Sequence, residues 1–421
     1  MLERFRARLI VGILLLMSNL SFSQSSQSPY SALGMGEVVQ PFLVSGMGMG
    51  GISIANPNNK HFNLMNPALL GVRDYFTTFE AGFTGESRTI TQNDLSQVNG
   101  SGNLMYLALA FPIKQGRWAS GIGMVPYTYT DYNIVSISPI NGIDEDAYYN
   151  FRGTGGLNSL FWSNGVKIGT NLSLGVKVSY LFGSRISETI IKVNQPNAYD
   201  AALYEQVRVR DLNFGFGGAY RIVTGETSQI LIGGIYELET YLNGEVNEFL
   251  ERRTPGTEIT LSTDTISYDE NREILLPRKI GIGISYVRSK ILIGADVIVQ
   301  NWGKRTDIQG ENNSYTNSYR SSVGIEFIPD AASVSSYFKR MKYRTGFSYE
   351  LTPYNVDNEQ IFEFGINFGV SLPIRPASQM DMAIQYGQRG GSKPSAINES
   401  YIRFSLGVTI NDVWFFRRKI D

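Results

Sequence analysis

The feature that most constrains this chain is a run of alternating side chains from Leu172 to Phe182. Every second position holds a large apolar residue, and mostly small or polar residues lie between them. The apolar members are Leu172, Leu174, Val176, Val178, Tyr180 and Phe182. Successive side chains of a β-strand point to opposite faces, so the run predicts a strand with one apolar and one polar face. Its length of about ten residues suits a tilted strand that crosses a bilayer.

The N-terminus has the pattern of a secretory signal peptide. Three arginines lie within the first eight residues, an uncharged apolar region follows from Leu9 to Met17, and small residues stand at Ser21 and Ser23. This order predicts cleavage before Gln24, with residues 1–23 removed. A retained interfacial anchor is the alternative, because the apolar region is too short for a spanning helix.

The composition excludes several classes of function. Cleavage would remove three arginines and one glutamate, which leaves 34 basic and 37 acidic residues and a net charge of −3. Nucleic acid is therefore not an expected partner, since its binding needs a clustered basic excess. The chain has no cysteine, so it has no disulfide and no cysteine-ligated metal. No later segment reaches about 18 consecutive apolar residues, which excludes a spanning helix.

Alternation of the same kind recurs along the chain and predicts an all-β protein. The expected fold is a transmembrane antiparallel β-barrel of fourteen strands. The 44 glycines, 24 tyrosines and 23 phenylalanines suit a curved wall with aromatic girdles. Short and long connections alternate along the chain. Bacterial barrels have short turns on the periplasmic side and long loops on the outer side, so this order places both termini in the periplasm. The predicted strands are 75–86, 102–113, 117–130, 149–163, 170–184, 207–222, 228–242, 277–288, 290–302, 317–328, 341–351, 360–373, 379–388 and 399–411.

The four tryptophans lie near predicted strand ends, where a membrane protein has its aromatic girdles. They are Trp118, Trp162, Trp302 and Trp414. The alternative is a soluble β-sandwich with tryptophans in its core. Sandwich strands are usually about five or six residues long, and the strands predicted here are longer, so we favour the barrel.

Residues 24–74 differ from the barrel region at 75–421. They are rich in glycine and proline, which suits compact irregular backbone, and they also contain many apolar side chains. Disordered arms lack such apolar content, so we expect residues 24–74 to fold into the lumen as a plug. A periplasmic arm is the alternative.

Several motifs resemble the FadL/TodX-type outer-membrane transporters of hydrophobic compounds, and the chain is most similar to Bacteroidetes-type members. The run from Phe62 to Ala68 resembles the hatch motif of this family, and the serine–proline–tyrosine start at Ser28 is similar to that of the Bacteroidetes-type members. The other matching segments are Arg152–Leu157, Ala295–Val297, Gln300–Trp302, Phe347–Tyr349 and Gly369–Pro373.

The resemblance implies a fourteen-stranded barrel, plugged by an N-terminal hatch, in the outer membrane of a Gram-negative cell. It implies passive transport of hydrophobic small molecules, such as long-chain fatty acids or hydrocarbons, by a monomer in contact with outer-membrane lipid. It assigns the hatch to Asn66, Pro67 and Ala68, although an ordinary proline turn is an alternative. A second possibility is an accessory FadL-like barrel of a protein secretion machine, which binds exported proteins. A third is a plugged structural barrel without transport.

Charged residues at inward positions of the strands could orient the head group of a substrate or form a structural ion-pair network. They are Lys177, Asp296, Glu326, Arg344, Glu363, Asp381 and Arg403. Among them, Glu326 and Arg344 are expected to pair across neighbouring strands. His61 is the only histidine, which excludes a two-histidine metal site, and no nucleophile-elbow or phosphate-loop motif is present. We therefore expect no enzyme activity, no metal and no cofactor.

The outer loops are the candidate surfaces for capture of a substrate. The predicted loop 185–206 is rich in apolar residues, and a loop of this kind could take up hydrophobic molecules. Packing over the barrel mouth is the alternative role. The candidate capture residues are Ile190, Ile191, Tyr199, Leu203 and Tyr204.

Overall fold

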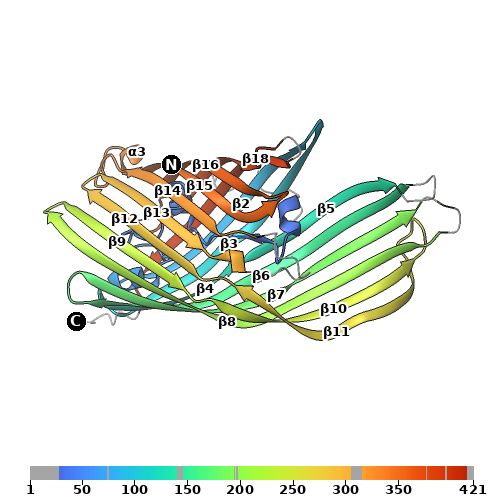
Figure 1. The fold of residues 1–421 in the computed structure, drawn as a ribbon. Coiled ribbons are helices and arrows are strands. Elements are labelled where there is room, and N and C mark those ends of the chain that lie inside the picture. Colours follow the sequence, from blue (N-terminus) through green and yellow to red (C-terminus); the bar gives the residue numbers. More distant parts are fainter. Residues whose placement is uncertain are drawn as a thin grey trace.

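The barrel wall consists of antiparallel strands that form one closed sheet (Figure 1). The computed structural model describes residues 28–73, 75–139, 146–193, 195, 198–304, 315–375, 377–393 and 396–414. The predicted signal peptide lies outside these residues. No helix among them is long and apolar enough to cross a membrane.

Fourteen strands make up the wall, as the alternation predicts. Strands β4 and β5 both pair with β6 and form one wall strand that is interrupted at Tyr127. In the same way β9 continues into β10, and β11 continues into β12. The last strand, β18, pairs with β2 from Asn398↔Thr91 to Asp412↔Thr77 and closes the barrel.

The strands of the first half are β2 (Thr77–Gln92), β3 (Leu95–Lys114), β4 (Trp118–Pro126), β5 (Thr128–Pro139), β6 (Asp146–Ile168), β7 (Leu172–Val193), β8 (Asp200–Gly225), β9 (Ser228–Glu237) and β10 (Thr240–Arg253). Those of the second half are β11 (Thr260–Leu276), β12 (Lys279–Arg288), β13 (Ile291–Gln300), β14 (Ser318–Phe327), β15 (Lys342–Val356), β16 (Glu359–Pro373), β17 (Gln379–Gly390) and β18 (Asn398–Asp412). Short helices η3 (Trp302–Lys304) and α3 (Tyr337–Arg340) lie in the connections.

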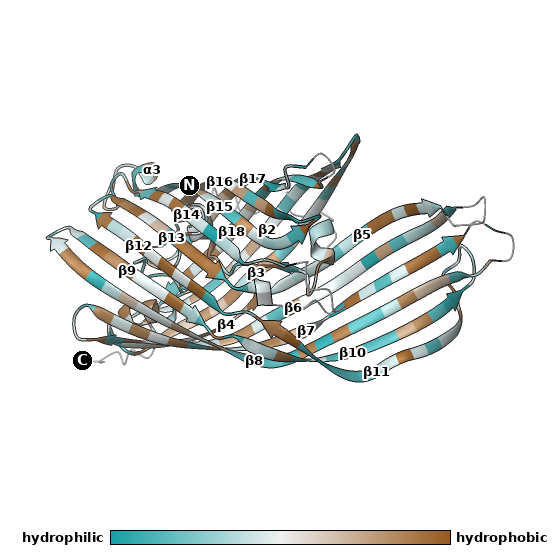
Figure 2. Ribbon diagram, viewed as in Figure 1, coloured by the Kyte–Doolittle hydropathy of each residue, from teal (hydrophilic) through white to brown (hydrophobic). Residues whose placement is uncertain are grey.

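Strand β7 has the two faces that its sequence predicts. Leu174, Val176 and Tyr180 are exposed on the outside of the wall, whereas Ser173 and Lys177 are buried on the inside. Hydropathy alternates in the same way along many wall strands (Figure 2). An apolar outer surface on a closed barrel is the arrangement of an outer-membrane protein.

The predicted long loops are mostly continuations of the strands. Residues 185–206 were expected to form a loop, but Arg185–Ile191 of β7 pairs with Ala201–Val207 of β8. Residues 243–276, which lie between the predicted strands 228–242 and 277–288, likewise form the β10–β11 hairpin. Strand pairing continues past the apolar belt because it satisfies the backbone N–H and C=O groups of both strands. The strand bounds at these hairpins were therefore predicted too short.

This continuation produces a flared sheet, which we call the outer leaf. It consists of the distal parts of β5, β6, β7, β8, β10 and β11, on the right of Figure 1. The opposite end of the barrel carries the short turns, and we call it the short-turn end. Three of the four tryptophans are exposed, as expected for a girdle, but the prediction for Trp302 was wrong. Trp302 is only 3% exposed and packs inside against Tyr30 and Tyr315.

The N-terminal segment packs against the inner face of the wall. It contains η1 (Pro29–Ala32), β1 (Glu37–Val38), α2 (Val44–Met47) and η2 (Pro67–Val72), joined by irregular backbone. Strand β1 pairs with β5, η2 contacts β4, β6, β7 and β8, and α2 contacts β16, β17 and β18. We call residues 28–73 the plug segment.

Candidate functional site: the contact between plug segment and wall

Glycines of the wall allow the backbone of the plug segment to approach closely. A Cβ atom on Gly175 of β7 would lie 2.3 Å from the carbonyl carbon of Pro67. A Cβ on Gly346 of β15 would lie 2.2 Å from the carbonyl carbon of Met49. Only glycine leaves room at these positions, so the wall and the plug segment fit together without a gap there.

Asn66, Pro67 and Ala68, which were predicted as hatch residues, occupy one of these close contacts. The Asn66 Oδ1 accepts a hydrogen bond of 3.0 Å from the N–H of Ala68 and caps η2, whose first residue is Pro67. The Asn66 Nδ2 donates to the carbonyl oxygens of Ile54 at 2.8 Å and Gly218 at 3.1 Å. Asn66 therefore joins two parts of the plug segment to strand β8.

Asp296 of β13 holds a second turn of the plug segment. Its Oδ2 accepts hydrogen bonds from the backbone N–H groups of Ser53 at 2.7 Å and Ile54 at 2.9 Å. The hydroxyl of Ser285 donates to the carbonyl oxygen of Ala55 at 2.6 Å. Side chains of the wall thus satisfy backbone N–H and C=O groups of this turn, which is not part of a helix or a sheet.

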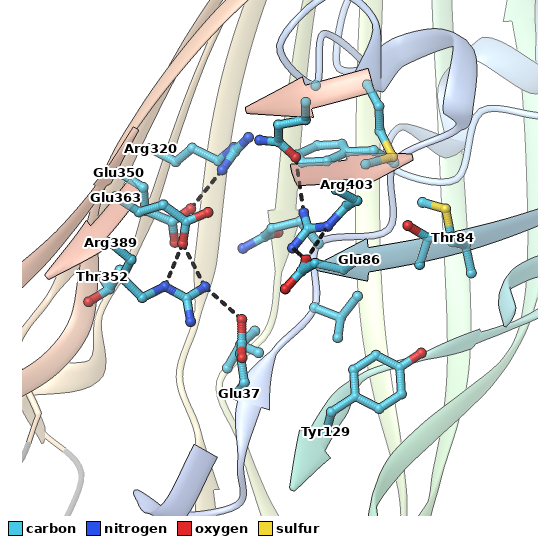
Figure 3. A pocket seen from close by; sticks show the side chains of 18 of the residues that line it. Glu37, Thr84, Glu86, Tyr129, Arg320, Glu350, Thr352, Glu363, Arg389 and Arg403 are labelled. Carbon is cyan, nitrogen blue, oxygen red and sulfur yellow. Dashed lines mark hydrogen bonds and ion pairs between the residues drawn. The ribbon is translucent and has the colours of Figure 1, made fainter. Parts of the chain in front are cut away.

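A cluster of buried charges lies where the plug segment meets the outer half of the barrel (Figure 3). The members of this outer ion cluster are Glu37, Glu86, Arg88, Glu363, Arg389, Glu399 and Arg403. Arg389 binds Glu37 of the plug segment at 2.6 Å and Glu363 of β16 at 2.6 Å. The cluster therefore ties β1 to the wall through charge-assisted hydrogen bonds.

The charges of the outer ion cluster also determine the ionisation of Glu37. Burial raises the pKa of Glu37, but the positive charges of Arg389 and Arg88 outweigh this effect and lower it to about 2. Glu37 is therefore ionised at neutral pH. The hydroxyl of Ser28 donates to Glu399 at 2.6 Å, so the first described residue is fixed in the same region.

His61 lies in a second polar group, nearer the short-turn end. Its Nδ1 is 2.5 Å from Oε1 of Glu80, and its Nε2 is 2.9 Å from Nε2 of Gln379. The other carboxylate oxygen of Glu80 accepts from the N–H of Phe62 at 3.1 Å. The ring is buried and bonded on both sides, so His61 connects the plug segment to the wall.

Arg344 continues this polar group across the wall. The expected pair is confirmed, since Nε of Arg344 lies 2.6 Å from Oε2 of Glu326 on the neighbouring strand. Nη1 of Arg344 lies 3.3 Å from Oδ1 of Asp381. Lys177, another predicted lumenal residue, donates to Glu237 at 2.8 Å.

Each predicted lumenal residue therefore has a partner within the protein. The seven residues are Lys177, Asp296, Glu326, Arg344, Glu363, Asp381 and Arg403. Six of them form ion pairs, as one of the two interpretations of these residues expects, and Asp296 accepts hydrogen bonds from backbone N–H groups of the plug segment. The described part of the chain contains no group of metal-ligating side chains.

The sequence analysis missed several members of the outer ion cluster. Glu86 and Arg88 of β2 stand at inward positions of an alternating strand, so the same pattern contained the signal for them. Glu37 had no such signal, because the plug segment has no periodicity. The five candidate capture residues do not gather at one site: Ile190 is buried, whereas Tyr199 and Leu203 are exposed.

A cavity of about 150 Å³ lies beside the outer ion cluster, lined by Glu37, Arg320, Arg389 and Arg403 among others. Apolar contacts fill the region below it, where the rings of Phe62 and Phe161 are 5.7 Å apart. The lining of this cavity thus combines the charged side chains of the cluster with apolar ones such as Phe42 and Met47.

Comparison with known proteins agrees with this architecture. A family model described as BamG matches residues 4–421. The chain belongs to the BamG family. None of the curated proteins matches this BamG-family chain in sequence.

Solved structures share the fold of this BamG-family chain. The CymD monoaromatic hydrocarbon channel is 14% identical with a TM-score of 0.57, over 90% of this chain and 99% of CymD. The toluene transporter TbuX of Ralstonia pickettii is 15% identical with a TM-score of 0.56, over 89% and 98%. A FadL homologue of Pseudomonas aeruginosa is 16% identical with a TM-score of 0.55, over 89% and 99%. The predicted FadL/TodX-type barrel is thereby confirmed at the level of the fold.

Proposed function

We propose that this protein is an accessory outer-membrane barrel that binds extended segments of exported polypeptides on its outer leaf. The observation that carries the proposal is the length of the strands in this leaf. β6, β7 and β8 contain 23, 22 and 26 residues, whereas a tilted strand crosses the bilayer with about 9–11. At least about half of each strand is therefore available for another purpose.

The edge of the outer leaf supports polypeptide binding. β11 pairs with β10, and its other edge has no strand partner among the described residues. Such an edge presents unpaired N–H and C=O groups, which an extended peptide satisfies by adding a strand. The exposed side chains of Ile266 and Tyr268 supply apolar contacts along β11.

The charge of this hairpin indicates the type of segment. Residues 240–276 contain eight carboxylates and three arginines. A bound segment with lysine or arginine residues would complement this excess, since opposite charges steer association and discriminate between partners. Short turns of bacterial barrels face the periplasm, so the leaf would extend from the outer surface of the membrane.

A shortened β10–β11 hairpin tests this proposal. Removing residues 249–266 and joining Glu248 to Ser267 through an Asn-Gly turn takes away the distal free edge. We expect the purified variant to bind a reduced, carboxymethylated basic polypeptide at least about tenfold more weakly than the intact protein, as measured by fluorescence anisotropy in detergent.

The matched control is a shortened β2–β3 hairpin that lacks residues 91–96. This hairpin is at the same end of the barrel but does not include the β11 edge. Equal loss of binding in both variants, or no loss in either, would contradict a role for the outer leaf.

Passage of hydrophobic small molecules is the second candidate, and the shared fold supports it. TbuX is a toluene transporter and CymD a monoaromatic hydrocarbon channel. In this chain such passage requires the plug segment to leave the outer ion cluster. The substrate would be an uncharged hydrocarbon or a long-chain fatty acid, taken up from the outer side.

Substitution of Glu37 tests this second candidate. Glu37→Gln removes the negative charge that Arg389 binds and weakens the attachment of β1 to the wall. If the protein is a transporter, labelled toluene or fatty acid should enter proteoliposomes several-fold faster with this variant. Glu359→Gln is the control, because Glu359 is outside the outer ion cluster and its carboxylate accepts hydrogen bonds from Ser392 and Lys393. Uptake at the rate of empty liposomes in all three proteins would count against transport.

A further inference from the structure

We infer that a cavity at the short-turn end binds an acidic, partly apolar segment of a periplasmic protein. This basal cavity has a volume of about 760 Å³, within the range of ligand sites. The plug segment contributes Pro57–Lys60, and turns of the wall contribute the remaining sides. The inference goes beyond the proposed function, because the outer leaf is at the opposite end of the barrel.

Positive charges dominate the lining of the basal cavity. The cationic residues are Lys60, Lys290, Arg340, Lys342 and Arg375, and Glu326 is the only carboxylate among the lining residues. Lys60 comes from the plug segment, and three separate connections of the wall supply Lys290, Arg340 and Arg375. Lys342 is the first residue of β15. A concave site lined by one sign of charge concentrates its field and attracts ligands of opposite charge.

The carboxylate of Glu326 does not neutralise this field. It already binds Arg344, which is outside the cavity lining, at 2.6 Å, and Lys342 at 3.9 Å. Within the described ranges, no carboxylate lies within 4.0 Å of the charged nitrogens of Lys290 or Arg375. These two cations are therefore available to an anionic partner.

Apolar side chains stand on the rim of the cavity: Val334 lines it, and Phe338 directly follows the lining residue Tyr337. Val334 is 98% exposed and Phe338 is 71% exposed. Both belong to the connection between β14 and β15, which contains α3 and is longer than the other turns at this end. Exposed apolar residues beside a charged cavity are typical of an interaction site rather than of a free surface.

Hydrogen bonds hold this connection in place. The N–H of Asp330 donates to the carbonyl of Lys339 at 2.8 Å, and the hydroxyl of Tyr337 donates to the carbonyl of Pro373 at 3.1 Å. The N–H of Ile328 donates to the carbonyl of Lys290 at 2.8 Å. These bonds link the β14–β15 connection to both neighbouring turns. A connection that is already held in place loses less conformational entropy when it binds a partner.

The combination of charge and apolar rim selects a polypeptide over other anions. A small ion would occupy the cations and leave Val334 and Phe338 in water. The plug turn Pro57–Lys60 lines the cavity, so the site is at the mouth of the barrel and not on its lipid-facing surface. A polypeptide segment with carboxylates and apolar side chains contacts both the cations of the cavity and the exposed apolar residues of its rim. Such a segment would also bridge the plug segment and the wall.

Charge reversal in the cavity tests the inference. The triple variant Lys290→Glu, Arg340→Glu and Arg375→Glu alters exposed residues of turns and leaves the wall unchanged. A fluorescent peptide of glutamate and leucine should bind the intact full chain in detergent and bind the triple variant at least about tenfold more weakly. Salt should weaken this binding, because exposed charges are screened.

The double variant Lys114→Glu and Arg117→Glu is the matched control. It reverses charges in the β3–β4 turn at the same end of the barrel, outside the cavity, and should bind the peptide like the intact protein. Peptides with glutamine for glutamate, or serine for leucine, should bind about tenfold more weakly. The inference is wrong if the triple variant binds normally or if the serine peptide binds equally well. It is also wrong if phosphate or phosphatidylglycerol vesicles bind the cavity as tightly as the peptide.

Discussion

At the scale of single residues, Asn66 joins two parts of the plug segment to each other and to the wall. One side chain caps η2, binds the turn at Ile54 and binds the wall at Gly218. Asparagine suits this position because it offers one acceptor and two donors. Aspartate would keep the cap but lose both donated hydrogen bonds.

Replacement of Asn66 should loosen the plug segment. Asn66→Ala removes an N-cap, worth about 1 kcal/mol, and leaves two carbonyl oxygens without their donor, at about 1 kcal/mol or more each. We expect faster hydrogen exchange of the η2 amides by at least about tenfold, measured by mass spectrometry.

Two variants make this prediction specific. Asn66→Asp should give an intermediate effect, because it retains the bond to the Ala68 N–H. Asn271→Ala changes an exposed residue of β11 and should leave η2 unaffected. Unchanged exchange in Asn66→Ala would show that close packing against Gly175 alone holds the hatch.

At the scale of elements, β7 displays the rule that builds the wall. Its apolar positions face outward and its small and polar positions face inward, against the plug segment and Glu237. The outward face has to match the hydrocarbon of the bilayer. The inward face has to match a protein surface, which explains its buried glycine, serine and lysine.

A charge on the outer face of β7 should destabilise the barrel according to its depth. Val176→Arg places a charge near the middle of the apolar run, where the cost is about 2–4 kcal/mol. Leu172→Arg is the matched control at the end of the run, where the cost is about 0–1 kcal/mol. Denaturant unfolding in lipid vesicles measures both, and equal values would mean that β7 does not cross the bilayer as placed here.

At the scale of the whole molecule, the plug segment and the wall form one packed body. The plug segment contacts strands from both halves of the barrel and supplies Glu37 to the outer ion cluster. The Ser28–Glu399 hydrogen bond joins residues 371 positions apart in the chain. The plug segment therefore adds a carboxylate to the ion pairs that the buried arginines make with the wall.

Removal of the plug segment should open the barrel. A secreted chain that lacks residues 28–70 should give a clear increase in single-channel conductance in planar bilayers, because the wall alone encloses a lumen lined by small and polar residues. The shortened β2–β3 hairpin variant keeps the plug segment and should conduct like the intact protein. A folded deletion variant with unchanged conductance would mean that other parts of the chain close the lumen.

Much of the wall could be predicted because its signal is local. The existence and order of all fourteen strands follow from a side-chain period of two, which each strand displays on its own. The Glu326–Arg344 pair was also accessible, because both residues stand at inward positions near the same ends of neighbouring strands. Trp302 was misplaced because a tryptophan at a strand end suits a girdle and an interior contact equally well.

The sequence by itself determined the barrel, its strand number and the outward apolar face, because lipid imposes the same alternation on every strand. Only the tertiary structure decided that the distal hairpins form an outer leaf and that Glu37 meets Arg389. It also decided that cations from the plug segment and three connections of the wall line one cavity. These features depend on residues hundreds of positions apart, and their proximity results from closure of the barrel and not from any local pattern.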